Sequence, residues 1–179
     1  MKKKTFLFTF LIISQIICAQ KYFTRTGTTN FKASVATFEA IEATNKSTTV
    51  LLKTDTGDIA AQLFIAAFTF KVALMQEHFN ENYMDSDKFP KATFRGKLEG
   101  FSIDTLKKEY PLLGTLTIRG IEKEIETIAR VVVTEGAIGI TSNFAVKPQD
   151  FDIKIPSIVR KKIAKSVNIN LNYELVEKI

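Results

Sequence analysis

The stretch VNINLNYEL, residues 167–175, alternates apolar and polar side chains without a break. One parity carries three asparagines and a glutamate, and the other carries Val167, Ile169, Leu171 and Tyr173. Because successive side chains of a strand point to opposite faces, this pattern predicts a half-buried strand with one wet face. Strands of that kind are typical of antiparallel sheets.

The same period of two runs through most of the chain. In TNFKASV, residues 29–35, Phe31, Ala33 and Val35 share one face. Further strand candidates are STTVLLKT (47–54), DIAAQLFIAAFTF (58–70), KATFRGKLEGFSID (91–104), LGTLTIRG (113–120), KEIETIARVVVT (123–134) and AIGITSNFAV (137–146). Glycines and a proline separate them, and TEGAIG (134–139) predicts a tight hairpin. About eight strands at this spacing predict an all-β domain, either a closed antiparallel barrel or a sandwich.

Two segments lack this period, and we predict one or two short helices there. In KVALMQEHFNENYMDSDKF (71–89), apolar residues recur near helical spacing. In PSIVRKKIAKS (156–166), Ile158, Ile163 and Ala164 lie on one side of the expected helix, opposite a basic side. That basic side has two interpretations, a solvated face or a peripheral contact with a membrane.

The first nineteen residues, MKKKTFLFTFLIISQIICA, have the pattern of a secretory signal peptide. Three lysines precede an uncharged apolar run that is shorter than the ~20 residues of a membrane-spanning helix. Ala19 suits the position before a cut, so we expect a mature domain from Gln20 to Ile179 that is periplasmic or secreted. An uncleaved anchor and lipid modification at Cys18 are the alternatives. With Cys18 removed, the mature chain has no cysteine and no disulfide.

Length and charge exclude several classes of protein. A chain of 179 residues suggests one domain. Its net charge of +6 falls to +3 once the three lysines of the signal are removed, and no basic cluster with interleaved aromatic residues occurs. Nucleic acid is therefore not an expected partner. The sequence does not indicate an oligomeric state.

The sequence also argues against an enzyme. The single histidine, His78, lies near several acids, including Glu77 and Glu81. A metal site needs three or four converging ligands, and the mature chain offers one histidine and no cysteine. There is no G-x-S-x-G elbow for a catalytic triad and no phosphate-binding glycine loop. We therefore predict no catalytic residues, no metal ligands and no cofactor.

The phenylalanines of the expected mature chain are the candidates for a binding function. An eight-stranded barrel has an interior that side chains can just fill, or that can hold one slender ligand. The predicted lumen residues are Phe31, Val35, Phe64, Phe68, Phe70, Phe79, Met84, Phe94, Leu98, Phe101 and Ile103. This set assumes that Phe64, Phe68 and Phe70 share one strand face, and that a bulge at Gly100 turns Phe101 inward. We also expect QEHFNENYM (76–84) to pack over one side of the barrel mouth, with Phe79 and Met84 pointing inward.

Three stretches resemble the polyisoprenoid-binding YceI-like family, and they occur in the order found in that family. They are NYMDSDKFPKATFRG (82–96), GTLTIRGIEKEIE (114–126) and SNFAVKPQDFDIKI (142–155). Lys147 stands where the family usually has arginine, and Asp152 where it usually has glycine. The early His-Ser motif is replaced by RTGTTNFKAS (25–34). The chain thus resembles a divergent branch of the family.

The resemblance implies an antiparallel, lipocalin-like β-barrel whose lumen holds an amphiphilic lipid. The expected function is that of an exported lipid-binding protein that holds a long-chain amphiphile, such as a polyisoprenoid or an isoprenoid quinone. The alternative is a ligand-free structural or interaction module of the cell envelope, with a filled barrel.

Overall fold

The computed structural model describes residues 20–34 and 40–178. In chain order its elements are β1 (Lys21–Ser34), β2 (Glu42–Lys53), β3 (Asp58–Phe64), the 3-10 turn η1 (Ile65–Ala67), β4 (Thr69–Phe70), α1 (Ala73–His78), the π-helical turn η2 (Phe79–Met84), β5 (Lys91–Leu98), β6 (Glu109–Ile118), β7 (Ile121–Thr134), β8 (Ala137–Val146), the 3-10 turn η3 (Pro148–Phe151) and β9 (Ile163–Glu177).

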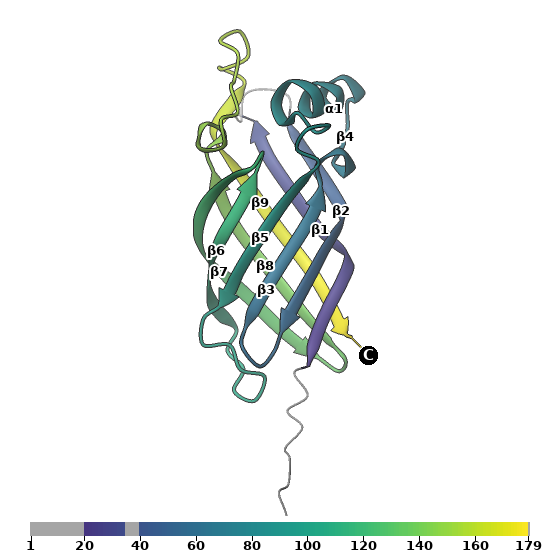
Figure 1. Ribbon diagram of the computed structural model, residues 1–179, viewed down its shortest axis with the longest axis vertical. Helices are drawn as coiled ribbons and strands as arrows, with labels where there is room; N and C mark the ends of the chain where they lie inside the picture. The colour runs from purple at the N-terminus through teal and green to yellow at the C-terminus, as the bar shows by residue number, and fades with distance from the viewer. Residues whose placement is uncertain (1–19, 35–39, 179) are drawn as a thin grey trace, which may run out of the picture.

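The strands form one antiparallel sheet that closes on itself (Figure 1). The order around the wall is β1-β9-β8-β7-β6-β5-β3-β2, and β1 pairs back onto β2. The two-residue β4 only extends the pairing of β2 at Ala43 and Thr44. The predicted antiparallel barrel is therefore confirmed. A sandwich is excluded, because every strand of the wall has a neighbour on both sides.

The two ends of the barrel differ. Figure 1 shows α1 at the upper end, and the end of β9 and the turn between β7 and β8 at the lower end. Large side chains fill the lower half, and we call this set the closed-end core. Its buried members are Tyr22, Val50, Leu52, Ile59, Leu98, Phe101, Tyr110, Leu112, Ala129, Val131, Ile138, Ile140, Tyr173 and Leu175. A separate apolar cluster occupies the upper half, under α1 and η2.

A polar layer, formed by Thr29, Asn45, Thr48 and Tyr173, lies between the two clusters. All four side chains are buried. Thr29, Asn45 and Thr48 lie where the pairing of β1 with β2 shifts register on either side of Gly27, and Tyr173 continues the inward alternation of β9. Register shifts of this kind change which parity faces inward, so the apolar alternation along β1 and β2 is interrupted there.

Several element predictions were wrong in detail. The segment 58–70 is not one strand, because η1 separates β3 from β4. The segment 91–104 is paired only as far as Leu98, and a turn at Gly100, with φ 69°, replaces the expected bulge. The segment 156–166 is not a helix but a series of turns that enters β9 at Ile163. The predicted hairpin after Thr134 is confirmed, with Thr134 paired to Ala137.

Candidate functional site

A cavity of about 380 Å³ lies in the upper half of the barrel, beneath α1 and η2, and we call it the chamber. Strands, helical turns and the connection between β8 and β9 all contribute to its wall. Its apolar lining is Phe31, Ala33, Ile41, Leu63, Ile65, Phe68, Phe70, Met75, Phe79, Met84, Ala92, Leu116, Ile118, Val146, Pro148, Phe151, Ile153, Ile155, Val159, Ile163, Val167 and Ile169. Such a lining suits a hydrocarbon chain and offers no reactive group to it.

Four aromatic rings pack against one another at one side of the chamber. Phe79 stacks on Phe31 with ring centroids 5.3 Å apart, and its ring lies 5.7 Å from that of Phe68 and 5.1 Å from that of Phe70. These separations are in the favourable range for offset or edge-to-face aromatic pairs. Phe79 belongs to η2, Phe31 to β1 and Phe70 to β4, and Phe68 lies just before β4. The rings therefore join the helical segment to the barrel wall.

The helical segment 73–84 is also held by polar contacts. The backbone N–H of Phe70 donates to Gln76 Oε1 at 3.3 Å, and Lys71 Nζ lies 2.7 Å from Glu42 Oε1 on β2. Asp85 ends η2 in the left-handed region, with φ 48°. Phe79 and Met84 of this segment line the chamber.

Four polar side chains also line the described part of the chamber: Thr29, His78, Tyr83 and Lys162. Thr29 belongs to the polar layer. It lies 2.9 Å from Thr48 and 3.0 Å from the Tyr173 hydroxyl, measured from its Oγ1 atom. His78 and Lys162 are exposed, and Tyr83 is half-buried. Partial burial raises the pKa of the Tyr83 hydroxyl above its ordinary value, so this group is a neutral hydrogen-bonding partner at physiological pH.

The predicted lumen residues fall into separate groups. Phe31, Phe68, Phe70, Phe79 and Met84 line the chamber. Four others belong to the closed-end core or pack against it, and these are Phe94, Leu98, Phe101 and Ile103. Val35 lies outside the described residues.

The assignment of Phe64 to the lumen was wrong. Its side chain is 50% exposed, and Lys91 Nζ lies over its ring at 5.1 Å from the centroid. The buried neighbour Leu63 takes the inward position on β3. The shared face that was assumed for Phe64, Phe68 and Phe70 does not exist, because η1 interrupts the alternation after Phe64.

The segment 147–163 supplies chamber residues that sequence analysis missed. Ile153, Ile155, Val159 and Ile163 contribute to the wall from a stretch with almost no regular structure. The spacing of Phe151, Ile153 and Ile155 by two residues was the available signal, but it is too short to identify an inward face by itself. Arg119 Nη1 holds this segment by donating to the carbonyl of Asp152 at 2.6 Å. Asp152 has φ 52°, a conformation that favours the glycine usual in the family.

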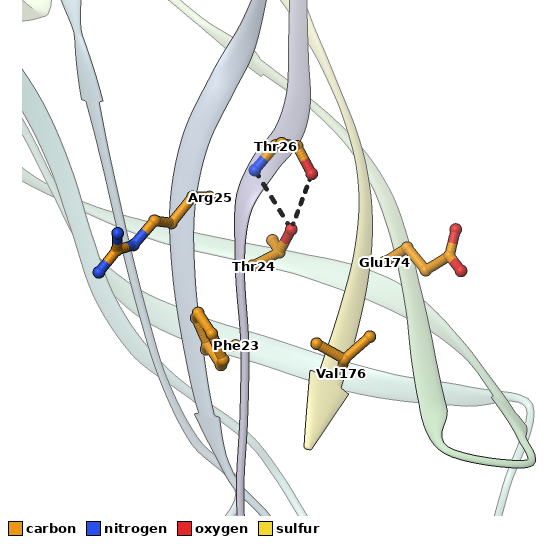
Figure 2. Close-up of a pocket in the computed structure, with 6 residues that line it drawn as sticks. All are labelled: Phe23, Thr24, Arg25, Thr26, Glu174 and Val176. Atoms are coloured by element: carbon orange, nitrogen blue, oxygen red, sulfur yellow. Dashed lines mark hydrogen bonds between the residues drawn. The ribbon is translucent and has the colours of Figure 1, made fainter. Parts of the chain in front are cut away.

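A hollow of about 590 Å³ lies on the outer face of the barrel, between β1 and β9. It forms where the pairing of β1 and β9 is interrupted between Phe23 and Thr28. Figure 2 shows Arg25 and Glu174 extending away from each other, while the Thr26 backbone N–H and hydroxyl lie within 3.2 Å of Thr24 Oγ1. The hollow is thus an open groove without converging functional groups, and the chamber is the better candidate site despite its smaller volume.

The described residues contain no group of three or more His, Cys, Asp or Glu side chains that could hold a metal ion. Across residues 20–34 and 40–178, no helix has both the length and the apolar character needed to cross a membrane.

Solved structures of other proteins share this fold. BcnA of Burkholderia cenocepacia is 16% identical, with a TM-score of 0.71 over 83% of this chain and 96% of its own. A polyisoprenoid binding domain from Saccharophagus degradans, implicated in plant cell wall breakdown, is 13% identical, with a TM-score of 0.76 over 88% of this chain and 98% of its own. The YCEI protein of Campylobacter jejuni is 21% identical, with a TM-score of 0.67 over 79% of this chain and 88% of its own.

None of the curated proteins matches the chain. The family model of the YceI-like domain does match, over residues 17–175. That match spans most of the barrel wall, from β1 to β9, together with the segment that closes one side of the chamber. The chain therefore belongs to the YceI-like domain family.

Proposed function

We propose that this protein is a lipid-binding barrel that holds the apolar tail of an amphiphile in the chamber and performs no catalysis. The observation that carries the proposal is the chamber itself, a cavity of about 380 Å³ whose lining is apolar except for four side chains. Each methylene buried from water contributes ~0.8 kcal/mol, so a hydrocarbon tail is the ligand part that such a lining favours most.

The polar side chains indicate how the ligand would be oriented. Thr29 already has hydrogen-bond partners in the polar layer, whereas His78 and Lys162 lie on exposed parts of the chamber wall. A head group beside His78 and Lys162 would stay in contact with water while the tail points toward Thr29. A few polar groups at the mouth of an apolar pocket commonly fix the orientation of a ligand.

The family supports an isoprenoid as the class of tail. The Saccharophagus degradans neighbour is described as a polyisoprenoid binding domain, and it has the same fold at 13% identity. We extend this description to the present chain as a proposal, with a polyisoprenoid or an isoprenoid quinone as the candidate ligand.

The test is native mass spectrometry of protein purified under gentle conditions, combined with extraction and identification of lipids. We expect an additional mass on the folded protein that is recovered in the lipid extract. If the purified protein carries no lipid, and also takes up none from added prenols, the proposal is wrong.

The runner-up is a ligand-free structural or interaction module of the cell envelope. The observation in its favour is the closed-end core, where side chains fill the lower half of the barrel. The same experiment separates the two functions, because a ligand-free module would neither co-purify with a lipid nor gain one.

We also propose that the protein is exported and that its mature form begins at Gln20. The support is the sequence pattern of residues 1–19, which lie outside the described part of the structure. N-terminal sequencing of the protein from its native host tests this. A retained Met1 or a lipid-modified Cys18 would contradict it.

A further inference from the structure

We propose that the barrel encloses only the last part of the ligand tail, about a dozen carbon atoms, and leaves the rest of the tail outside. This inference rests on the proposed lipid-binding function and adds the length of chain that the site recognises. It follows from three features of the interior: a layer of buried polar side chains from the neighbouring strands β9, β1 and β2, a filled space below that layer, and a limited volume above it.

The polar layer forms the floor of the chamber. Thr29 lies at its centre, with its Oγ1 atom 2.9 Å from Thr48 Oγ1 and 3.0 Å from the Tyr173 hydroxyl. Asn45 is fully buried and donates through Nδ2 to the carbonyl of Phe64 at 2.9 Å. A tail that passed this level would have to separate buried polar groups that are satisfied by one another, and hydrocarbon would offer them no replacement.

The space below the polar layer is already filled. Val50, Leu98 and Tyr110 are fully buried there, and the Phe101 ring lies 5.3 Å from that of Tyr110. Even Gly27 is in close contact, because a Cβ atom added to it would lie 2.7 Å from the Tyr173 ring. The lower half of the barrel therefore has no room for a tail unless the core is rebuilt.

The volume above the layer sets the length of tail. A cavity of about 380 Å³ lies at the lower end of the ~300–1,000 Å³ of small-molecule pockets. A methylene occupies about as much space as a water molecule, whose share of liquid volume is ~30 Å³, so the chamber holds about a dozen carbon atoms. This corresponds to the end of a polyisoprenoid chain and not to its whole length.

The experiment measures the affinity of the delipidated full-length protein for 1-alkanols of increasing length, by displacement of a fluorescent fatty-acid probe. While the tail still fits inside, each added methylene should tighten binding about fourfold. Beyond about a dozen carbons the affinity should level off, because further methylenes stay in contact with water. A continued fourfold gain per methylene up to eighteen carbons would overturn the inference while leaving the lipid-binding function intact. Failure of every alkanol to bind would overturn both.

Two variants test the position of the floor. Leu63→Ala enlarges the chamber from β3, whereas Val50→Ala makes a similar deletion on the adjacent strand, just below the polar layer. The plateau is the alkanol length beyond which affinity no longer rises. We expect Leu63→Ala to move this plateau to longer alkanols and Val50→Ala to leave it unchanged. A plateau that lengthens in Val50→Ala would show that tails pass the polar layer, which contradicts the inference.

A third variant covers the case in which Leu63→Ala does not fold. Ala92 is a half-buried chamber residue on β5, and Ala92→Leu should shorten the plateau by filling part of the space. Thr93→Leu is its matched control, because the alternation along β5 places Thr93 on the opposite face of the wall. An unchanged plateau in Ala92→Leu would place the bound tail outside the chamber and overturn the inference.

Discussion

At the scale of single residues, Gly114 shows why the barrel wall needs a glycine where the family motif has one. A Cβ atom at this position would lie 2.7 Å from the Phe94 ring and would also collide with the backbone carbonyl of Arg95. A Cβ atom added to Gly96, the partner of Gly114 across the β5–β6 ladder, would lie 2.7 Å from the same ring. The two glycines therefore make room for Phe94, which packs against the closed-end core and does not line the chamber.

We predict that Gly114→Ala lowers the free energy of unfolding by about 2–3 kcal/mol, because overpacking of this kind forces backbone and ring to shift. Gly139 on β8 is the matched control, since a Cβ atom there would meet nothing closer than 3.6 Å. Gly139→Ala should be neutral or stabilising by up to about 1 kcal/mol, because alanine lowers the conformational entropy of the unfolded chain. Urea unfolding of the two variants measures both effects, and equal destabilisation by both would contradict the explanation.

Because of Tyr173, the stability of the barrel is expected to fall at alkaline pH. Burial raises the pKa of its hydroxyl from 10.0 to about 12, while the hydrogen bond with Thr29 lowers it slightly. The folded protein thus favours the protonated phenol more than the unfolded chain does. This contribution to stability is fully present below pH 10 and is lost as the pH rises from 10 through 12.

Tyr173→Phe removes this titration and keeps the ring. At pH 8 the variant should be less stable by about 1 kcal/mol, the usual net value of a hydrogen bond. Between pH 10 and 12 the wild type should lose up to about 1.4 kcal/mol per pH unit relative to the variant. Urea unfolding at several pH values checks this, and other ionisable groups cancel because both proteins contain them. A constant difference in stability across this range would contradict the prediction.

At the scale of elements, α1 and η2 depend on Phe79 for their attachment to the barrel. Phe79 contacts the three chamber phenylalanines, whereas Leu74 on α1 is 56% exposed. We predict that Phe79→Ala costs about 2–3 kcal/mol of stability, below the ~3–5 kcal/mol of a fully buried phenylalanine, and that it lowers lipid retention. Leu74→Ala should change stability by less than about 0.5 kcal/mol. Urea unfolding measures the stability of both variants, and lipid extraction measures their lipid retention. Equal effects of the two substitutions would show that Phe79 does not attach α1 and η2 to the barrel.

We propose that the turn segment 156–162 is a contact for an anionic membrane at the chamber end of the barrel. Ile158 is 87% exposed, and Arg160, Lys161 and Lys162 follow it directly. An exposed apolar side chain beside basic residues suits a surface of anionic lipids, to which each Lys or Arg contributes about 1 kcal/mol. The same segment lines the chamber through Val159 and Lys162, so such a contact would lie beside the site that receives the tail.

We predict that the protein sediments with vesicles containing phosphatidylglycerol and much less with pure phosphatidylcholine vesicles. Ile158→Asp should weaken this binding about tenfold or more, since it removes an apolar contact and adds a negative charge. Val132→Asp is the matched control, because Val132 is 62% exposed on the barrel wall, on β7. Equal losses for the two variants would show that this segment is not the contact.

At the scale of the whole molecule, seven of the eight strands of the wall contribute side chains to both halves of the barrel, and β7 contributes to the closed-end core. We therefore expect one cooperative unfolding transition and a melting temperature that depends on bound lipid. A ligand present at one hundred times its Kd adds about 2.7 kcal/mol of stability. For a domain of this size, that corresponds to a rise of roughly 5–10 °C. Calorimetry before and after delipidation measures the shift, and an unchanged melting temperature would argue for the ligand-free module.

The sequence by itself determined the class of the fold and most of the wall. The alternation in residues 167–175 identified β9 and its inward face, and the strand from Ala137 to Val146 was predicted with its correct bounds. Phe31, Phe79 and Met84, which the sequence analysis pointed inward, line the chamber; they lie next to an unbroken alternation or on a short helix with one apolar side. Local patterns of this kind depend on neighbours along the chain, which a sequence displays directly.

Only the tertiary structure decided which side chains surround the chamber and which fill the closed-end core. Phe64 and Phe68 differ in environment because η1 interrupts the alternation, and Thr29 meets Thr48 and Tyr173 because β1 pairs with both β2 and β9. The segment 147–163 lines the chamber, although its period of two covers only residues 151–155. The physical reason is that a turn or bulge changes the inward parity, and closure of the barrel joins strands far apart in sequence, so neither effect can be read from local alternation.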